Sequence, residues 1–138
     1  MDYIRASLGS TNLLVDFELE GDPHTMLYIN KIRVTRAVIN LIDNALDAIR
    51  EKENGRVILR GKILANEVKL EVEDNGRGIF TDKTQKIWQA GYSTKNHPGV
   101  GLAFVKQVAE GHGGSVHIKS EAGKGTKIWM TLPLGENQ

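Results

Sequence analysis

The sequence VINLIDNALDAI, residues 38–49, is the stretch around which the predicted fold is organised. At about 3.6 residues per turn, its apolar residues share one helical face and its short polar residues share the opposite face. Surface helices usually carry long Lys and Glu side chains, whereas amides and carboxylates are weaker helix formers. Their side chains are short and have few rotatable bonds, so their oxygens are well placed to bind a hard cation such as Mg²⁺. An ordinary solvent-exposed face is an equally good interpretation of this helix alone. The apolar set is Val38, Leu41, Ile42, Ala45, Leu46 and Ile49, and the polar set is Asn40, Asp43, Asn44 and Asp47.

The composition fits one globular domain over residues 1–138, since 40% of the 138 residues are hydrophobic and 25% are charged. The net charge is +1 without a basic block, so nothing points to nucleic acid or an acidic membrane surface. The chain has no Cys, which excludes disulfides, thiolate catalysis and zinc–thiolate sites and fits a cytoplasmic location. No apolar run is long enough to cross a bilayer, so we expect no membrane insertion. The His residues are scattered without metal-binding spacing.

Periodicity along the rest of the chain predicts further helices and strands. Residues 80–98 follow no strong pattern, which is typical of a functional loop or lid. The order of elements predicts an α/β fold, a two-layer sandwich in which a mixed sheet of about five strands is covered on one face by about three helices. The predicted helices are 2–8, 27–52 and 102–110, and the predicted strands are 13–19, 56–64, 68–72, 115–120 and 126–132.

The motif Asp74-Asn75-Gly76-Arg77-Gly78 directly follows a predicted strand. Asn-Gly after alternating apolar residues is the strongest short hairpin signal, so a simple turn is the leading interpretation of the motif alone. No good strand follows Ile79, however, and the hairpin would lack a partner. A carboxylate beside two glycines is also suited to gripping a flat heterocycle. Asp74 would accept a hydrogen bond from an exocyclic amine such as that of adenine, which contributes about 1.5–3 kcal/mol.

The motif Gly99-Val100-Gly101-Leu102 opens a predicted helix. Unpaired backbone N–H groups at the positive end of a helix dipole form a ready phosphate site. A lone Gly-x-Gly is weak evidence, and an ordinary loop is the default interpretation. Neither the dinucleotide fingerprint nor a P-loop is present. Ser93-Thr94-Lys95 lies just before this motif, where Lys95 would supply a cation for a terminal phosphate or would simply be exposed.

Taken in order, these motifs resemble the ATP-binding catalytic domain of sensor histidine kinases. That domain has the Bergerat fold and belongs to the superfamily shared with gyrase B, Hsp90 and MutL. The resemblance runs from about Leu13 to Leu134, and each motif is weak alone but strong in this order and spacing. The motifs are Asn40-x-x-x-Asn44, Asp74-x-Gly76-x-Gly78, Ser93-Thr94-Lys95, Gly99-x-Gly101-Leu102 and Gly125-Thr126.

The resemblance implies ATP and Mg²⁺ as cofactors and a role for each matched residue. Asn44 would hold the Mg²⁺ that bridges the ATP phosphates, and Asp74 would read adenine. Thr126 would support Asp74 through a water molecule, and Lys95 would lie near the γ-phosphate as a catalytic residue. The other implied nucleotide-binding residues are Asp47, Gly76, Gly78, Ile79, Tyr92, Ser93, Thr94, Gly99, Val100, Gly101 and Leu102.

Asn40 distinguishes this chain from hydrolytic members of the superfamily. Gyrase-like proteins carry a Glu one helical turn before the metal-binding Asn, where the Glu activates water. Asn40 cannot act as a base, and phosphoryl transfer depends mostly on positioning and charge neutralisation. The resemblance therefore implies slow hydrolysis and transfer of the γ-phosphate to a histidine on a partner.

The chain also departs from the family pattern. Ala103 replaces a third Gly, and Asp47 stands where many relatives carry Lys or Arg, where it would assist the metal ion from outside its ligand shell. No phosphoacceptor segment is present, so residues 1–12 are expected to be a helix or linker from a missing dimerisation domain. The implied partners are that histidine-bearing domain and a response regulator receiver domain. The resemblance also implies a monomeric fragment of a homodimeric parent, and it leaves open whether that parent is anchored in a membrane. The alternatives are a serine kinase of the anti-sigma-factor type and an ATP-switched binding module.

Overall fold

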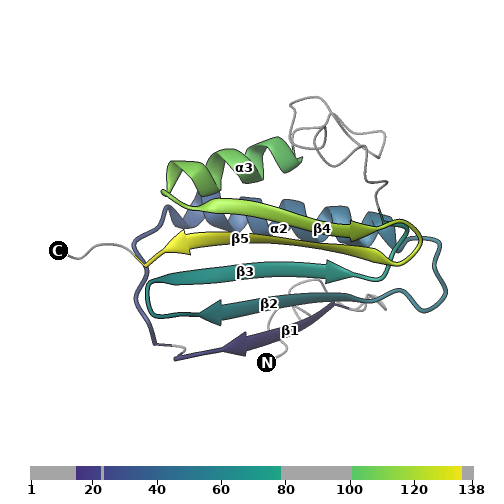
Figure 1. The fold of residues 1–138 in the computed structure, drawn as a ribbon, viewed down its shortest axis with the longest axis horizontal. Coiled ribbons are helices and arrows are strands. Elements are labelled where there is room, and N and C mark those ends of the chain that lie inside the picture. Colours follow the sequence, from purple (N-terminus) through teal and green to yellow (C-terminus); the bar gives the residue numbers. More distant parts are fainter. Residues whose placement is uncertain (1–14, 23, 79–100, 135–138) are drawn as a thin grey trace.

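The computed structural model describes residues 15–22, 24–78 and 101–134, which form a mixed sheet with helices on one face (Figure 1). This part of the chain confirms the predicted two-layer α/β sandwich with five strands, and it contains two of the about three expected helices. The predicted helix 2–8 and the predicted lid 80–98 lie outside the described residues. The strands are β1 (Val15–Glu20), β2 (Val57–Ile63), β3 (Glu67–Asp74), β4 (Ser115–Glu121) and β5 (Gly125–Pro133), and the helices are α2 (Lys31–Ala48) and α3 (Gly101–Gly111).

The strands lie in the order β1-β2-β3-β5-β4, as Figure 1 shows from the bottom of the sheet to the top. β1 and β2 are parallel and are connected through α2, because parallel neighbours require a crossover. All other neighbours are antiparallel. β3 pairs with β2 and β5, so the Asn75-Gly76 turn does not lead into a hairpin partner of β3 within the described residues. The simple hairpin interpretation of that motif is therefore wrong.

Helix α2 is shorter at both ends than the range 27–52 that the periodicity predicts. It begins after Asn30, whose side-chain oxygen accepts a hydrogen bond from the backbone N–H of Arg33 at 3.1 Å. Such a cap satisfies an N–H group that has no partner inside the helix. At the other end, the backbone N–H of Arg50 donates to the Asp47 carbonyl at 3.2 Å, so the chain turns before Lys52. Capping, rather than apolar spacing, sets these bounds.

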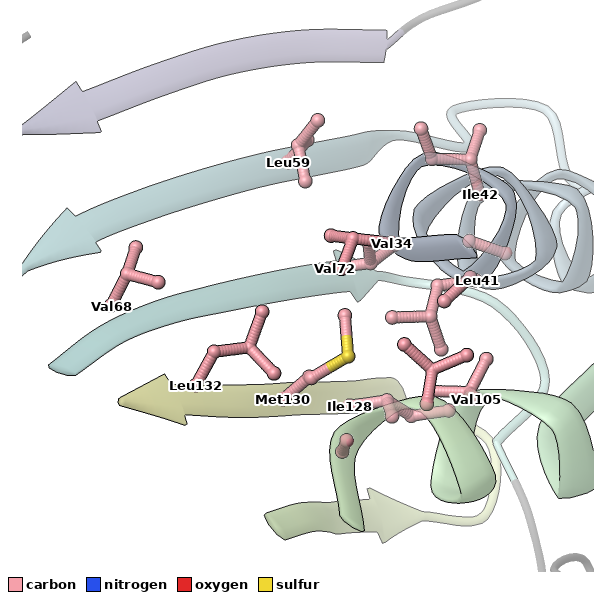
Figure 2. Close-up of a cluster of buried hydrophobic side chains, with 14 of the residues drawn as sticks. Val34, Leu41, Ile42, Leu59, Val68, Val72, Val105, Ile128, Met130 and Leu132 are labelled. Atoms are coloured by element: carbon pink, nitrogen blue, oxygen red, sulfur yellow. The ribbon is translucent and has the colours of Figure 1, made fainter. Parts of the chain in front are cut away.

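The hydrophobic core lies between the helices and the sheet. The predicted apolar face of α2 is confirmed, because its residues are buried or pack against the core. Figure 2 shows Leu41 and Ile42 of α2 in one cluster with Val72 of β3 and Met130 of β5. Because this packing fixes the rotation of α2 about its axis, it also fixes where the polar face of the helix points. The core residues from the other elements include Val57, Leu59, Val68, Val105, Val108, Ala109, Ile128 and Leu132.

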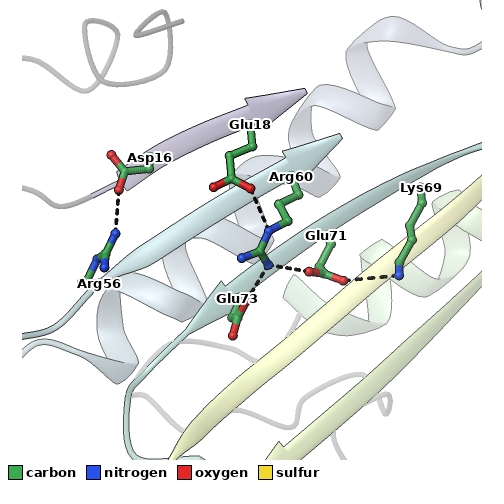
Figure 3. Close-up of polar contacts among 7 residues, drawn as sticks. All are labelled: Asp16, Glu18, Arg56, Arg60, Lys69, Glu71 and Glu73. Atoms are coloured by element: carbon green, nitrogen blue, oxygen red, sulfur yellow. Dashed lines mark hydrogen bonds and ion pairs between the residues drawn. The ribbon is translucent and has the colours of Figure 1, made fainter. Parts of the chain in front are cut away.

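Within the described residues, the opposite face of the sheet carries charged side chains and no helix (Figure 3). Arg60 of β2 is hydrogen-bonded to Glu18 at 3.0 Å, Glu71 at 2.8 Å and Glu73 at 2.5 Å. These carboxylates, Glu73 foremost, raise the pKa of Arg60 above its usual value. Glu71 is only 6% exposed and also contacts Lys69 at 3.4 Å. A buried carboxylate on this face is thus compensated by two cations.

Candidate functional site

The polar face of α2 points towards the start of α3. The side-chain amide of Asn40 donates to the carbonyl of Gly101 at 3.4 Å. A Cβ atom placed on Gly101 would lie 3.6 Å from the amide nitrogen of Asn44. Asn40 and Asn44 are half-buried here, whereas Asp43 is exposed to solvent. Tertiary packing thus brings two amides of the first motif together with the N-terminus of α3.

Asp47 completes the polar face but is engaged by two arginines. Its side chain is 8% exposed, and one carboxylate oxygen accepts a hydrogen bond from Arg77 at 3.1 Å. The other oxygen forms an ion pair with Arg50. The backbone carbonyl of Asp47 also accepts from Arg77, at 3.2 Å. Both carboxylate oxygens therefore face guanidinium groups, and the expectation that Asp47 assists a metal ion stays a prediction. Sequence spacing does not reveal this pairing, because Arg77 belongs to a distant loop.

Asp74 ends β3 and is buried, with 8% of its surface exposed. Its carboxylate accepts a hydrogen bond from the backbone N–H of Gly76 at 2.7 Å. Burial raises the pKa of Asp74 to about 6, while backbone hydrogen bonds from Gly76 and Thr126 and the nearby charge of Arg77 oppose that rise. At neutral pH the site thus presents a desolvated carboxylate whose direction is fixed by the main chain.

Thr126 lies directly opposite Asp74 in the β3–β5 register. Its backbone N–H donates a hydrogen bond to the Asp74 carboxylate. Support through a water molecule, which the resemblance implies, stays a prediction. The Thr126 hydroxyl pairs with the hydroxyl of Ser120 at 2.8 Å, and Ser120 also donates to the Gly125 carbonyl at 3.2 Å. Ser120 was missed from the sequence, since a Ser in a strand carries no signal until its register is known.

The loop after β3, residues 75–78, is held between α2 and the turn that joins β4 to β5. A Cβ atom on Gly76 would lie 2.5 Å from the carbonyl oxygen of Ala48, so only glycine allows this approach to the end of α2. Gly78 has a φ of +74°, and a Cβ atom there would clash with the backbone of Glu121. The N–H of Gly123 donates to the carbonyl of Arg77 at 2.6 Å. These contacts fix the position of the loop on both of its sides.

Asn75 anchors the first residue of the same loop. Its side-chain oxygen accepts from the N–H of Arg56 at 2.7 Å, and its amide donates to the Asn54 carbonyl at 2.9 Å. This residue was not singled out from the sequence, where it counted only as a turn former. The Asn-Gly pair itself could have indicated this role, because an Asn side chain in a turn often forms hydrogen bonds with nearby backbone groups.

The remaining predicted residues are only partly covered by the structure. Gly101 is the first residue of α3, and Leu102 is half-buried and packs against the core. The described residues contain no helix that is both long and apolar enough to span a membrane. The predicted positions Ile79, Tyr92, Ser93, Thr94, Lys95, Gly99 and Val100 lie outside the described residues.

Comparison with known proteins places this arrangement in context. Residues 29–136 match the family model described as histidine kinase-, DNA gyrase B-, and HSP90-like ATPase. The chain is 33% identical over 128 residues to the sensor histidine kinase YclK of Bacillus subtilis, which covers 87% of this chain and 26% of YclK. It is 40% identical over 95 residues to the sensor histidine kinase DcuS of Escherichia coli, which covers 68% of this chain and 18% of DcuS. The chain thus spans about a quarter or less of these relatives.

Solved structures share the fold. The catalytic domain of histidine kinase ThkA superposes with a TM-score of 0.79 at 21% identity, covering 95% of this chain and 86% of that domain. Full-length ShkA in complex with AMPPNP gives a TM-score of 0.76 at 25% identity, over 90% of this chain and 26% of ShkA. The mycobacterial sensor histidine kinase MprB gives 0.67 at 28% identity, over 86% of this chain and 81% of that chain.

Proposed function

The chain belongs to the family of histidine kinase-, DNA gyrase B- and HSP90-like ATPases, and from this premise we propose that it is the ATP-binding catalytic domain of a sensor histidine kinase. In this proposal the domain transfers the γ-phosphate of ATP to a histidine on a separate dimerisation domain, from which the phosphate passes to a response regulator. The supporting relatives are sensor histidine kinases, and a full-length relative structure, that of ShkA, holds AMPPNP.

The observation that carries the proposal is that two segments, the loop after β3 and the start of α3, both meet helix α2. The loop after β3 meets the end of α2 where Gly76 approaches Ala48. The start of α3 meets the middle of α2 where Gly101 contacts Asn40 and approaches Asn44. The carboxylate of Asp74 for a purine and the amides of Asn40 and Asn44 beside a helix N-terminus for phosphates thus lie along the same helix, the first near its end and the second at its middle.

Asp74 is proposed to recognise adenine. Its buried carboxylate would accept a hydrogen bond from the exocyclic amine, and a bond to a charged acceptor contributes about 1.5–3 kcal/mol. Guanine presents a carbonyl in place of that amine, so the two acceptors would face each other unpaired in a desolvated site. Gly76 and Gly78 admit no side chain, because the backbone of Ala48 and of Glu121 lies against them, and this close packing holds the loop beside Asp74.

Asn44 is proposed to contribute the protein ligand for Mg²⁺. The described residues contain no cluster of His, Cys, Asp or Glu that could hold a metal ion by itself. Mg²⁺ commonly keeps several waters and binds through few protein oxygens together with substrate phosphates, so a single amide oxygen fits this ion. When bound, Mg²⁺ would neutralise charge on the transferring phosphate. Asp47 is not part of this proposal, because Arg77 and Arg50 occupy its carboxylate.

Asn40 is proposed to preserve ATP for a partner. Its amide donates to the Gly101 carbonyl, so the side chain helps to place the start of α3 and supplies no base for water. Intrinsic hydrolysis would be slow, and the nucleophile would come with the partner domain. The predicted lid 80–98, with Tyr92, Ser93, Thr94 and the cationic Lys95, would close over the triphosphate, and Gly99 and Val100 would contact it.

The decisive binding experiment is titration of ATP into the wild type and three variants, with and without Mg²⁺. We expect Asp74→Asn to abolish nucleotide binding, because the amide turns a donor towards the adenine amine. Asn44→Asp should change the dependence of affinity on Mg²⁺ concentration. Asp43→Asn, on the same helix but exposed, is the matched control and should bind like the wild type. Full ATP affinity in Asp74→Asn would contradict the proposed pocket.

The decisive transfer experiment is incubation with labelled ATP and a histidine-bearing dimerisation domain. Acid-labile phosphohistidine on that domain supports the histidine kinase, and acid-stable phosphoserine on a protein substrate would instead indicate the anti-sigma-factor type of serine kinase. Binding without transfer to any partner would indicate an ATP-controlled switch. Rapid ATP hydrolysis by the domain alone, abolished by substitution of Asn40, would contradict the role assigned to that residue.

A further inference from the structure

Asp47 and Arg77 form a clasp that joins the end of α2 to the loop after β3. The guanidinium of Arg77 bonds Asp47 twice, through one nitrogen to the backbone carbonyl at 3.2 Å and through another to the carboxylate at 3.1 Å. This two-point contact fixes the direction of the planar guanidinium as well as its distance. The clasp closes beside Gly76, which already rests against the carbonyl of Ala48.

The clasp differs from an ordinary surface ion pair, which contributes little and restrains nothing in particular. The Asp47 side chain is only 8% exposed, while Arg77 is 49% exposed and Arg50 is 69% exposed. Of the two cations, Arg50 lies in the turn that directly follows α2, so its ion pair with Asp47 is local to the end of that helix. Only Arg77 carries the contact across to the loop, whose far side is held by the hydrogen bond from Gly123.

The clasp also acts on the charge of Asp74. Arg77 lies near enough to favour the ionised carboxylate, which burial disfavours and which Glu73 on the same strand also disfavours. Among the described residues near the loop, Arg50 pairs with Asp47 at the end of α2, and Glu121 pairs with Lys124 in the turn between β4 and β5. Among the described residues, Arg77 is the cation whose charge opposes the effect of burial on Asp74.

We propose that Asp47 is a positioning residue for purine recognition, which holds Arg77 so that Asp74 meets the purine amine as an ionised, correctly directed carboxylate. The inference rests on the proposed function, because it assumes that Asp74 reads the purine. It assigns Asp47 a role in the purine half of the site and none at the metal ion. It also makes the effect of Asp47 depend entirely on Arg77.

The test is binding of ADP in the presence of EDTA, measured by calorimetry between pH 5 and 8. Without a metal ion, this probe isolates purine recognition from any function of Asp47 near Mg²⁺. We expect Asp47→Asn and Arg77→Gln each to weaken binding about three- to ten-fold at pH 7, as for the loss of one partly exposed charge pair. Both should also move the acidic loss of affinity to higher pH, and the double variant should be no worse than either single one.

Two further variants separate positioning from general stabilisation. Arg50→Gln removes the other partner of Asp47 without touching the loop, and should keep the wild-type affinity and pH profile. Arg77→Lys keeps the positive charge but loses the two-point contact. Its pH profile should therefore be closer to that of the wild type than its affinity is. Circular dichroism of each variant reports folding, and if Asp47→Asn fails to fold, the more exposed Arg77 variants provide the same readout.

The outcomes distinguish this inference from the proposed function. If the wild type binds no ADP or ATP at any pH, the proposed function fails and the inference fails with it. If the wild type binds but folded Asp47→Asn and Arg77→Gln keep its affinity and pH profile, only the inference is overturned. A defect of Asp47→Asn that appears only with Mg²⁺ also overturns it, because Asp47 would then act at the metal ion.

Discussion

The carboxyl group of Asp74 is buried at the end of β3, where burial raises its pKa to about 6. In the unfolded chain this group has an ordinary pKa near 3.8, so the native state binds a proton more tightly than the unfolded state. The stability that comes from the protonated form is fully present below the unfolded pKa and is lost as the pH rises through the folded pKa. The residue proposed to read the purine therefore costs stability when it is charged, as functional groups often do.

At the residue scale, we predict that Asp74 lowers the free energy of unfolding as the pH rises from 4 to 7. The expected loss is about 2–3 kcal/mol, since each unit of pKa shift corresponds to about 1.4 kcal/mol. Urea unfolding of the wild type and Asp74→Asn at both pH values isolates the effect, because other carboxylates contribute equally to both proteins. Parallel pH dependences in the two proteins would contradict the raised pKa.

At the element scale, α2 and α3 are joined by a histidine as well as by apolar packing. The N–H of Asn30, the cap of α2, donates to Nε2 of His112 at 3.0 Å. Nδ1 of the same ring lies 2.8 Å from the carbonyl of Val108 near the end of α3 and acts as the donor there. The neutral ring with its proton on Nδ1 satisfies both contacts. The start of one helix thus depends on the end of the other.

We predict that His112→Ala lowers the free energy of unfolding by about 1 kcal/mol, the usual contribution of a lost hydrogen bond that leaves a partner unpaired. Urea unfolding at pH 7.5 measures the change. Lys119→Ala, at an exposed position on β4, is the control and should stay within about 0.5 kcal/mol of the wild type. Equal stability of His112→Ala and the control would show that packing alone sets the start of α2.

At the scale of the whole molecule, the two faces of the sheet differ in what covers them. One face carries α2 and α3 and, through them, the candidate site. The other face carries the charged network around Arg60 (Figure 3). Glu71 lies beneath this network, and loss of its cationic partner would leave a buried carboxylate poorly compensated. The network therefore contributes to stability, and Glu73 links it to Asp74, the next residue of β3.

We predict that Arg60→Ala lowers the free energy of unfolding by about 2 kcal/mol, less than for a fully buried pair because the Arg60 side chain is 34% exposed. Arg56→Ala removes a more exposed ion pair, with Asp16, and should cost less than about 1 kcal/mol. Both variants should keep the wild-type ATP affinity. Weaker ATP binding by folded Arg60→Ala would show that the two faces are coupled.

Much of this molecule could be predicted from local sequence. The apolar face of α2, the alternating strands and the turn between β4 and β5 follow from periodicity and glycine placement, which act over a few residues. The order of the motifs also pointed to the family to which the chain belongs. The role of Lys95 and the lid 80–98 remains a prediction, since those residues lie outside the described part of the chain.

The sequence by itself determined which segments are helix and strand and which residue types line a purine and phosphate site, because those properties depend on neighbouring residues. Only the tertiary structure decided that β5 lies beside β3, which sets Thr126 opposite Asp74 and excludes a hairpin at Asn75. It likewise decided that Asp47 pairs with Arg77. Pairing between distant segments depends on which faces are buried together and in what register, and no local pattern records that choice.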